Sequence, residues 1–282
     1  MKHKVIVFND NKYSLGEGPI YDYRNKFISW VDIVGESLYI MDENNLKQIK
    51  FNERIGAALP IEGSDGYIVL GTSSIFLYEN DEIKVLKSLE GITDGTNRCN
   101  DAKADPMGRV WFSTIVDDGI HSPSSTLYCY YNNVIKEMDN DLKLGNGMAW
   151  NKENNKFYLN DSANHKIYVY DYDLKTGSIS NKKVLCDMGF DTPDGMTIDN
   201  SDNLFIAIWD GSRIEVRNSK TGALKEEIKM PTSLITSATF IGEKMDTLLV
   251  TSAKLDRTDE FAGNIFKVKT SYIGLDINLV KI

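Results

Sequence analysis

The stretch Thr192-Pro193-Asp194-Gly195-Met196-Thr197-Ile198-Asp199 places a carboxylate between a proline and a glycine, directly before an apolar run. Because proline fixes one backbone torsion and glycine permits many, the pair should hold Asp194 in a tight loop at the start of a strand. Looser versions of the same pattern occur at 17–22, 100–105 and 146–151. A local pattern that recurs along the chain indicates a fold built from repeated units.

The period of the repeat is marked by short motifs of the type Leu-Tyr or Ile-Tyr, with looser copies near the end of the chain. These motifs begin at residues 38, 77, 127, 167, 214 and 265, so the successive intervals are 39, 50, 40, 47 and 51 residues. A period of about 40 to 50 residues is typical of β-propellers. Six such repeats fill the chain.

Within each repeat the sequence has the texture of strands joined by turns. β-branched and aromatic residues crowd segments such as 26–32 and 166–170, while Asn, Asp, Gly and Ser crowd the gaps. No stretch of a dozen residues keeps the period of a helix. We therefore predict an all-β fold, a six-bladed β-propeller with four antiparallel strands per blade, as a single domain over residues 1–282. A β-sandwich is the structural alternative, but it would not produce this repeat length.

The two ends of the chain are expected to close the ring. Residues 5–8 read as a strand that precedes the first repeat, and the chain ends in another apolar, strand-like run. We expect one of them to complete a blade with the other.

Charge and composition limit the possible partners and locations. The chain has 32 Lys and Arg against 41 Asp and Glu, a net charge of -9, and no long basic run, so nucleic acid is not an expected partner. The apolar run near the N-terminus is too short for a signal peptide or a membrane span, which predicts a cytoplasmic location and no membrane partner. The three cysteines, an odd number without a CxxC motif, predict reduced thiols packed in strands.

Candidate ligands occur at the starts of the repeats. In a propeller the innermost strands line the central channel, and Glu17, Asn100, Asn146 and Asp194 open the first, third, fourth and fifth repeats. Glu17, Asn146 and Asp194 supply two carboxylates and one amide oxygen, a set that suits a divalent cation. Calcium is favoured, with magnesium, manganese or zinc as alternatives. Each residue alone is also an ordinary turn former beside glycine, so the prediction depends on their shared place in the repeat.

Six short motifs are spread along the chain: Leu15-Gly16-Glu17-Gly18-Pro19, Arg98-Cys99-Asn100-Asp101, Asp105-Pro106-Met107-Gly108-Arg109, Asn146-Gly147-Met148, Pro193-Asp194-Gly195-Met196 and Ala262-Gly263-Asn264-Ile265-Phe266. In their order and spacing, from about residue 13 to 270, they together resemble the senescence marker protein, gluconolactonase and regucalcin family.

The resemblance implies a six-bladed propeller with one divalent cation at the channel mouth, held by Glu17, Asn146 and Asp194, that hydrolyses sugar lactones and related cyclic esters. It also implies that Arg98 and Asn100 bind hydroxyl and carbonyl oxygens of the substrate, and that Asp194 is the base that activates water. Asp118 stands where many relatives carry a glutamate that contacts sugar hydroxyls. Because its side chain is shorter, a preference for gluconolactone is less expected.

The leading hypothesis is therefore a metal-dependent lactonase, a gluconolactonase-like carboxylic ester hydrolase with a small-molecule lactone substrate, acting as a monomer or small homo-oligomer. The cation would polarise the lactone carbonyl and lower the pKa of water, and Asp194 would take the proton. The alternatives are a calcium-binding or protein-interaction propeller with little catalysis, and a phosphotriesterase-like hydrolase. The sequence has no GxSxG or HExxH motif, which disfavours a serine hydrolase and a zinc protease.

For three further residues the sequence allows more than one role. Arg98 could instead form an ion pair with Asp94 or Asp101. Asp161 could orient a site residue, although a turn role is favoured. His121 lies in the loop-like stretch around 117–125, which could act as a lid over the mouth.

Overall fold

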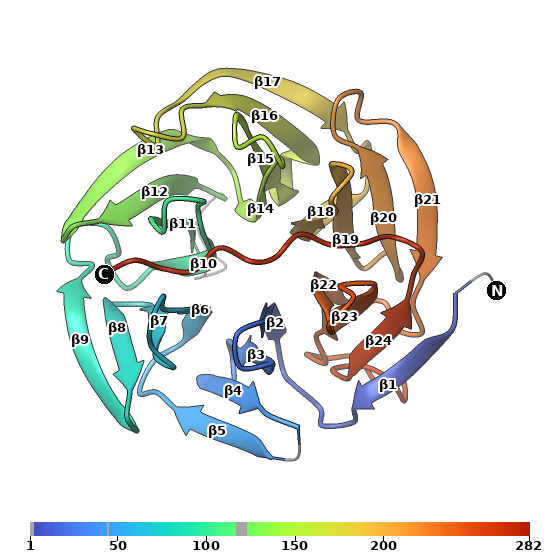
Figure 1. Ribbon diagram of the computed structural model, residues 1–282, viewed down its shortest axis with the longest axis horizontal. Coiled ribbons are helices and arrows are strands. Elements are labelled where there is room, and N and C mark those ends of the chain that lie inside the picture. Colours follow the sequence, from blue (N-terminus) through green and yellow to red (C-terminus); the bar gives the residue numbers. More distant parts are fainter. Residues whose placement is uncertain (1–2, 44, 117–122) are drawn as a thin grey trace.

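The strands form six four-stranded antiparallel sheets arranged as a ring around a central channel (Figure 1). The computed structural model describes residues 3–43, 45–116 and 123–282. In these ranges it contains 24 strands and one short helical turn, η1 (Ser162–Asn164). The predicted all-β, six-bladed propeller is confirmed.

The blades follow one another along the chain, and each runs from an innermost to an outermost strand. Blade 1 is β2 (Gly16–Asp22), β3 (Phe27–Asp32), β4 (Ser37–Met41) and β5 (Leu46–Lys50); blade 2 is β6 (Ile55–Pro60), β7 (Tyr67–Gly71), β8 (Ser74–Glu79) and β9 (Glu82–Ser88); blade 3 is β10 (Asn97–Ala104), β11 (Val110–Val116), β12 (Ser125–Tyr131) and β13 (Val134–Leu142). Blade 4 is β14 (Gly145–Trp150), β15 (Lys156–Asp161), β16 (Lys166–Tyr172) and β17 (Ile179–Asp187); blade 5 is β18 (Thr192–Ile198), β19 (Asn203–Trp209), β20 (Arg213–Asn218) and β21 (Leu224–Lys229); blade 6 is β22 (Ile235–Ile241), β23 (Thr247–Ser252), β24 (Ile265–Lys269) and β1 (Val5–Asn9).

The motifs that set the sequence period all lie on the third strand of a blade, namely β4, β8, β12, β16, β20 and β24. The period is irregular because the loops between the strands differ in length. The connection between β23 and β24, for example, spans residues 253–264 and gives the longest interval.

The N-terminal strand closes the ring by pairing with β24, where Val7 lies opposite Phe266. The apolar run at the end of the chain does not take part in this pairing, so that part of the expectation was wrong. Its backbone instead crosses one end of the channel (Figure 1). Gly274 donates a hydrogen bond from N to the carbonyl of Met245 (2.7 Å), and Val280 donates one to Pro60 (2.9 Å). Because β24 and β1 already fill the third and fourth positions of the blade, the tail pairs with the strand ends that it crosses.

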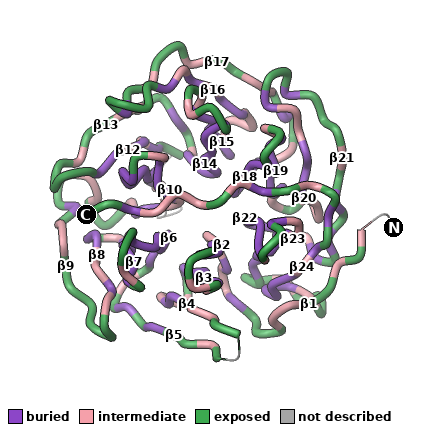
Figure 2. Tube along the Cα trace, viewed as in Figure 1, coloured by how far each residue is buried: buried purple, intermediate pink, exposed green. Residues whose placement is uncertain are grey.

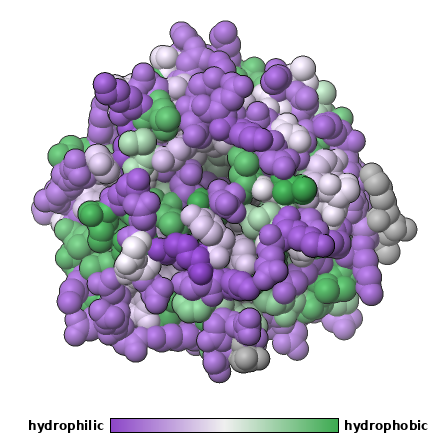
Figure 3. Space-filling view, viewed as in Figure 1, coloured by the Kyte–Doolittle hydropathy of each residue, from purple (hydrophilic) through white to green (hydrophobic). Residues whose placement is uncertain are grey.

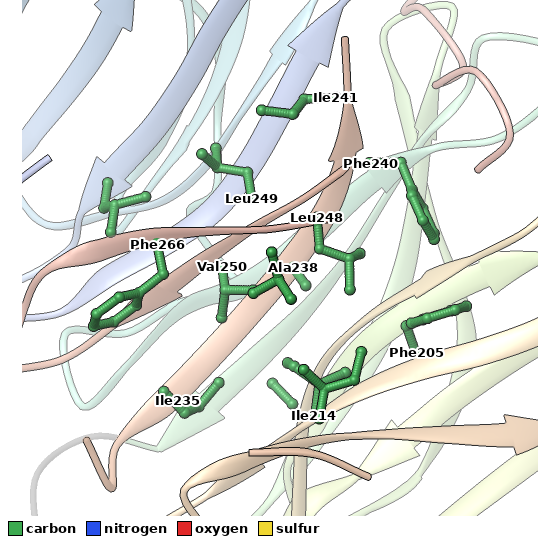
Figure 4. Packing of buried hydrophobic residues seen from close by; sticks show 14 of the residues in the cluster. Phe205, Ile214, Ile235, Ala238, Phe240, Ile241, Leu248, Leu249, Val250 and Phe266 are labelled. Atoms are coloured by element: carbon green, nitrogen blue, oxygen red, sulfur yellow. The ribbon is translucent and has the colours of Figure 1, made fainter. Parts of the chain in front are cut away.

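The core lies between the faces of neighbouring blades. Burial is concentrated on the inner and middle strands, whereas the outermost strands are largely exposed (Figure 2). Figure 4 shows one such layer, in which Phe205 and Ile214 of blade 5 belong to the same cluster as Phe240, Val250 and Phe266 of blade 6. Burial of a large apolar side chain stabilises a fold by about 1.5–3 kcal/mol. Layers of this kind therefore fix the blades, and with them the starts of the inner strands.

The Asp or Asn at the end of the repeated pattern forms turns. Asp199 accepts a hydrogen bond at Oδ1 from the backbone N of Asn203 (2.7 Å), and Asn151 accepts one at Oδ1 from the backbone N of Lys156 (2.8 Å). Both side chains are buried in the turn between the first two strands of a blade. They lie at the opposite end of the inner strand from Asp194 and its equivalents, so they serve the fold.

The cysteines are unpaired and lie in strands, as predicted. Cys99, Cys129 and Cys186 are free thiols that lie in β10, β12 and β17. The face of the ring crossed by the C-terminal tail is mainly hydrophilic (Figure 3). Over the described ranges, no helix is long and apolar enough to cross a membrane.

Candidate functional site

A break in strand register near the start of each inner strand positions the candidate residues. The shift follows Glu17 in β2, Asn146 in β14 and Pro193 in β18. The other three inner strands, β6, β10 and β22, shift at the corresponding place. Such bulges redirect a side chain and are common beside active sites. The recurring sequence pattern is therefore the signature of a bulge at the channel wall.

A cavity of about 280 Å³ opens at this end of the channel. Blades 1, 3, 4 and 5 each contribute three side chains to it, at equivalent positions of each blade. The deepest set, which we call the floor, comes from the inner strands and consists of Glu17, Asn100, Asn146 and Asp194. The set nearer the mouth, which we call the collar, consists of Leu15, Ile33, Arg98, Ile115, Leu144, Ser162, Thr192 and Trp209.

The vertical order of these two sets follows from strand geometry. The inner strands run from the mouth towards the tail, so a residue two positions earlier points into the same channel but closer to the mouth. Leu15 and Glu17 are related in this way, as are Leu144 and Asn146. Five of the six site residues predicted from the sequence line this one cavity: Glu17, Arg98, Asn100, Asn146 and Asp194. The sixth, Asp118, lies outside the described residues.

Asp194 is held from both its side chain and its backbone. Asn146 donates from Nδ2 to Oδ1 of Asp194 (2.5 Å), and Asn160 donates from Nδ2 to the carbonyl oxygen of Asp194 (2.6 Å). Ser162 donates from Oγ to the carbonyl of Pro193 (2.6 Å). Asp194 and these three donors are all buried. The carboxylate is thus pinned by the neighbouring blade, in which β15 and the turn after it carry two of the donors.

The two floor carboxylates repel each other. Burial, followed by the charge of Asp101, raises the pKa of Glu17 to about 8, while the guanidinium of Arg98 acts in the opposite direction. Burial and then the charges of Glu17 and Asp101 raise the pKa of Asp194 well above its usual range. Part of the Glu17 side chain is exposed to the cavity, so water there weakens the desolvation of this carboxyl. The floor is a place where added positive charge would be stabilising.

The donor set fits a divalent cation through its chemistry. Glu17, Asn146 and Asp194 offer only oxygen ligands, which calcium and magnesium prefer. Among the described residues, no three His, Cys, Asp or Glu side chains are grouped to hold a metal, and here the third donor is an amide. The equivalent positions of blades 2 and 6 are Gly56 and Thr236, and the Thr236 hydroxyl donates to the carbonyl of Gly16 (2.6 Å). A cation would therefore be held from blades 1, 4 and 5.

Arg98 is fixed by its own strand. Its Nη1 donates to the carbonyl of Cys99 (2.9 Å) and to Oδ1 of Asn100 (3.4 Å), and the Asn100 amide donates to the carbonyl of Gly145 (3.1 Å). Arg98 is buried beside the floor, with its charge close enough to influence Glu17. A buried guanidinium at a cavity wall is well suited to binding oxygen atoms of a ligand.

The chain is similar to known proteins along most of its length. Residues 15–254 match the family described as SMP-30/Gluconolactonase/LRE-like region. The chain belongs to this family. The Bacillus subtilis (strain 168) protein YvrE, provisionally named a sugar lactone lactonase, is 29% identical, with 94% of each chain covered. Regucalcin of Gallus gallus is 27% identical, again with 94% of each chain covered. The solved structure of a luciferin-regenerating enzyme superposes with a TM-score of 0.93 at 28% identity, covering 99% of this chain and 100% of that one.

In this SMP-30/gluconolactonase family member, two buried acids position the floor through the backbone. Asp161 accepts a hydrogen bond at Oδ1 from the backbone N of Leu144 (3.0 Å), and Asp32 accepts one at Oδ1 from the backbone N of Leu15 (2.9 Å). In each blade the residue that donates this bond stands two positions before the floor residue in the chain. Asp161 thus orients a site residue through the loop that it anchors.

The sequence did not single out Asp32, Asn160 or Ser162. The available signal was the aspartate at the end of the second strand in both blade 1 and blade 4, at Asp32 and Asp161. Asn160 and Ser162 flank the second of these acids, but their hydrogen bonds run to the next blade, which the sequence does not reveal.

Proposed function

We propose that this protein is a metal-dependent lactonase that hydrolyses a small-molecule lactone at the floor of the cavity. The observation that carries the proposal is the convergence of Glu17, Asn146 and Asp194 beside the buried guanidinium of Arg98. A purely structural ion site would not require Arg98 and Asn100. Membership of the SMP-30/gluconolactonase family and similarity to YvrE, provisionally named a sugar lactone lactonase, support this reading.

We propose that Glu17, Asn146 and Asp194 hold one divalent cation, with calcium favoured because every donor is an oxygen. Magnesium, manganese and zinc are the alternatives. When bound, a divalent cation polarises a carbonyl oxygen and lowers the pKa of water.

The side chains of the floor then carry out a hydrolysis. Asp194 accepts a proton from water as the water oxygen attacks the lactone carbonyl carbon. The bond between the carbonyl carbon and the ring oxygen breaks, the ring oxygen takes the proton that Asp194 accepted, and a hydroxy acid is formed. In the cation-free floor, burial and the charge of Glu17 raise the pKa of Asp194. A bound cation would lower this pKa and keep the carboxylate ionised, which a general base requires. Arg98 and the amide of Asn100 bind substrate oxygens and so hold the carbonyl over the floor.

Asp118, the cellular location and the oligomeric state lie outside the site described above. For Asp118 we propose a role in binding the substrate, so that Asp118→Ala should mainly raise KM. The cytoplasmic location, and a monomer or small homo-oligomer as the working form, stay predictions from the sequence.

The Asp194→Asn variant tests the proposal. Asparagine preserves the shape of the side chain but cannot accept the proton, and loss of a general base typically lowers the rate by about 10²- to 10⁴-fold. The assay follows acid release from a panel of lactones with a pH indicator. Asp141→Asn is the matched control because the Asp141 side chain is 96% exposed on the outermost strand β13. Near wild-type rates for Asp194→Asn would show that another group activates water.

A further inference from the structure

The collar differs from the floor in chemical character. Five of its eight side chains are apolar, and they come from all four blades that line the cavity: Leu15, Ile33, Ile115, Leu144 and Trp209. All four members of the floor are polar or charged. The described part of the cavity therefore changes from polar at the bottom to largely apolar at the mouth.

The three polar members of the collar do not make it a site for many hydroxyl groups. Ser162 already donates to the carbonyl of Pro193 and accepts from the amide of Asn146 at 3.3 Å. Arg98 donates to the carbonyl of Cys99 on its own strand and to Oδ1 of Asn100, a member of the floor. Thr192 is the remaining polar member. A hydroxyl group buried without a partner lowers affinity by roughly tenfold or more.

Three exposed apolar side chains follow or precede collar residues in the chain or lie in a loop bonded next to one. Val34, Phe190 and Leu255 are among the exposed large apolar side chains, and Phe190 is fully exposed. Val34 adjoins Ile33, and Phe190 lies in the loop that leads into β18, two residues before Thr192. Leu255 donates from its backbone N to the carbonyl of Ser14 (3.1 Å), next to Leu15.

We propose that the substrate is a lactone carrying an apolar substituent, an alkyl chain or an aryl group, rather than a polyhydroxylated sugar lactone. The lactone carbonyl lies at the polar floor, and the substituent packs against Ile115, Leu144 and Trp209 on its way to the mouth. This inference rests on the proposed lactonase function and specifies its substrate class. Each methylene removed from water against such a wall strengthens binding about fourfold.

The test uses lactones of one ring size and increasing chain length. δ-Valerolactone, δ-octalactone, δ-decalactone and glucono-δ-lactone are compared by kcat/KM with the metal-loaded protein. We expect kcat/KM to rise roughly fourfold per methylene until the cavity is filled, and to be lowest for glucono-δ-lactone relative to the alkyl lactones. A flat dependence on chain length, or a preference for glucono-δ-lactone, overturns the inference while leaving the lactonase function intact. Absence of turnover with every lactone overturns the lactonase function and this inference with it.

Variants of the collar locate the effect. Ile115→Asn and Leu144→Asn should each lower the ratio of kcat/KM for δ-decalactone over δ-valerolactone by about tenfold or more, because both remove apolar contact and introduce an amide. The ratio is independent of the fraction of folded enzyme. Ile83→Asn is the matched control, since Ile83 is 40% exposed on the outermost strand β9, and it should keep the wild-type ratio. Unchanged ratios in both collar variants would overturn the placement of the substituent against the collar.

Discussion

Removing the charge of Glu17 should stabilise the metal-free protein at alkaline pH. The pKa of Glu17 is raised in the fold from its usual 4.5 to about 8, so the folded state binds a proton more tightly than the unfolded state. The carboxyl is protonated in both states below about pH 4.5 and ionised in both above about pH 8. Stability is therefore lost as the pH rises through this window, according to the linkage between proton binding and unfolding.

The size of the loss follows from the shift. At about 1.4 kcal/mol per pKa unit, a change from 4.5 to about 8 corresponds to roughly 5 kcal/mol. Contact of the Glu17 side chain with water in the cavity reduces this to roughly 2–4 kcal/mol. For a chain of this size about 2 °C in Tm corresponds to 1 kcal/mol, so the expected fall in Tm is about 4–8 °C.

The assay is thermal unfolding at pH 5 and at pH 8.5 in the presence of a chelator. Wild-type protein should lose about 4–8 °C more between the two pH values than Glu17→Gln, which carries no charge at this position. Excess calcium should restore most of the loss in wild type, because a bound cation replaces the proton between the floor carboxylates. Equal pH dependence of Tm in wild type and Glu17→Gln would refute the assignment of the alkaline loss of stability to the Glu17 carboxyl.

Three further changes test how the floor and the fold are built. Asn160→Leu removes the hydrogen bond to the backbone carbonyl of Asp194, so kcat should fall about 10- to 100-fold. An unchanged kcat would argue against a role of Asn160 in positioning Asp194. Gly195→Ala would press a methyl group against the side chain and the Cα of Ser237, so the protein should lose about 1–3 kcal/mol of stability, measured through Tm. Ser237→Gly removes only the side-chain part of this contact and should reverse the loss in part; no reversal would contradict the side-chain contact. Deleting residues 274–282 removes the backbone hydrogen bonds that the C-terminal segment makes where it crosses the channel. The deletion should lower Tm, while lactone turnover continues. Complete loss of turnover in protein that is still folded would show that this segment affects the floor.

The sequence was sufficient to predict the fold and the floor because both repeat. Glu17, Asn146 and Asp194 each sit at the same place in a unit of about 40 to 50 residues, and the repeat itself implies that they face one channel. The structure explains this regularity through the register shift at the start of every inner strand. In a repeat fold of this kind, the place of a residue in the repeat predicts its place around the channel.

The contacts that support the floor were not predictable in the same way. Asn160 looks like any polar residue near a strand end, and its role depends on reaching the backbone of Asp194 in the next blade. Ile115 and Leu144 read as ordinary strand or loop apolar residues, although they line the cavity. The C-terminal run has the composition of a strand, but β1 occupies the position that it would have taken beside β24. In each case the outcome depends on which surface lies opposite, information that a single sequence does not carry.

Adding a metal back to chelated protein decides whether Glu17, Asn146 and Asp194 form the site of a cation-dependent lactonase. Lactone turnover and cation binding by calorimetry are measured on the same sample as calcium, magnesium, manganese or zinc is titrated. We expect no turnover after chelation, recovery in proportion to the filling of one site per chain, and a marked loss of affinity in Glu17→Gln. Wild-type turnover that persists in the chelated protein, or cation binding that restores no turnover on any lactone, would contradict a cation-dependent lactonase site at these three residues.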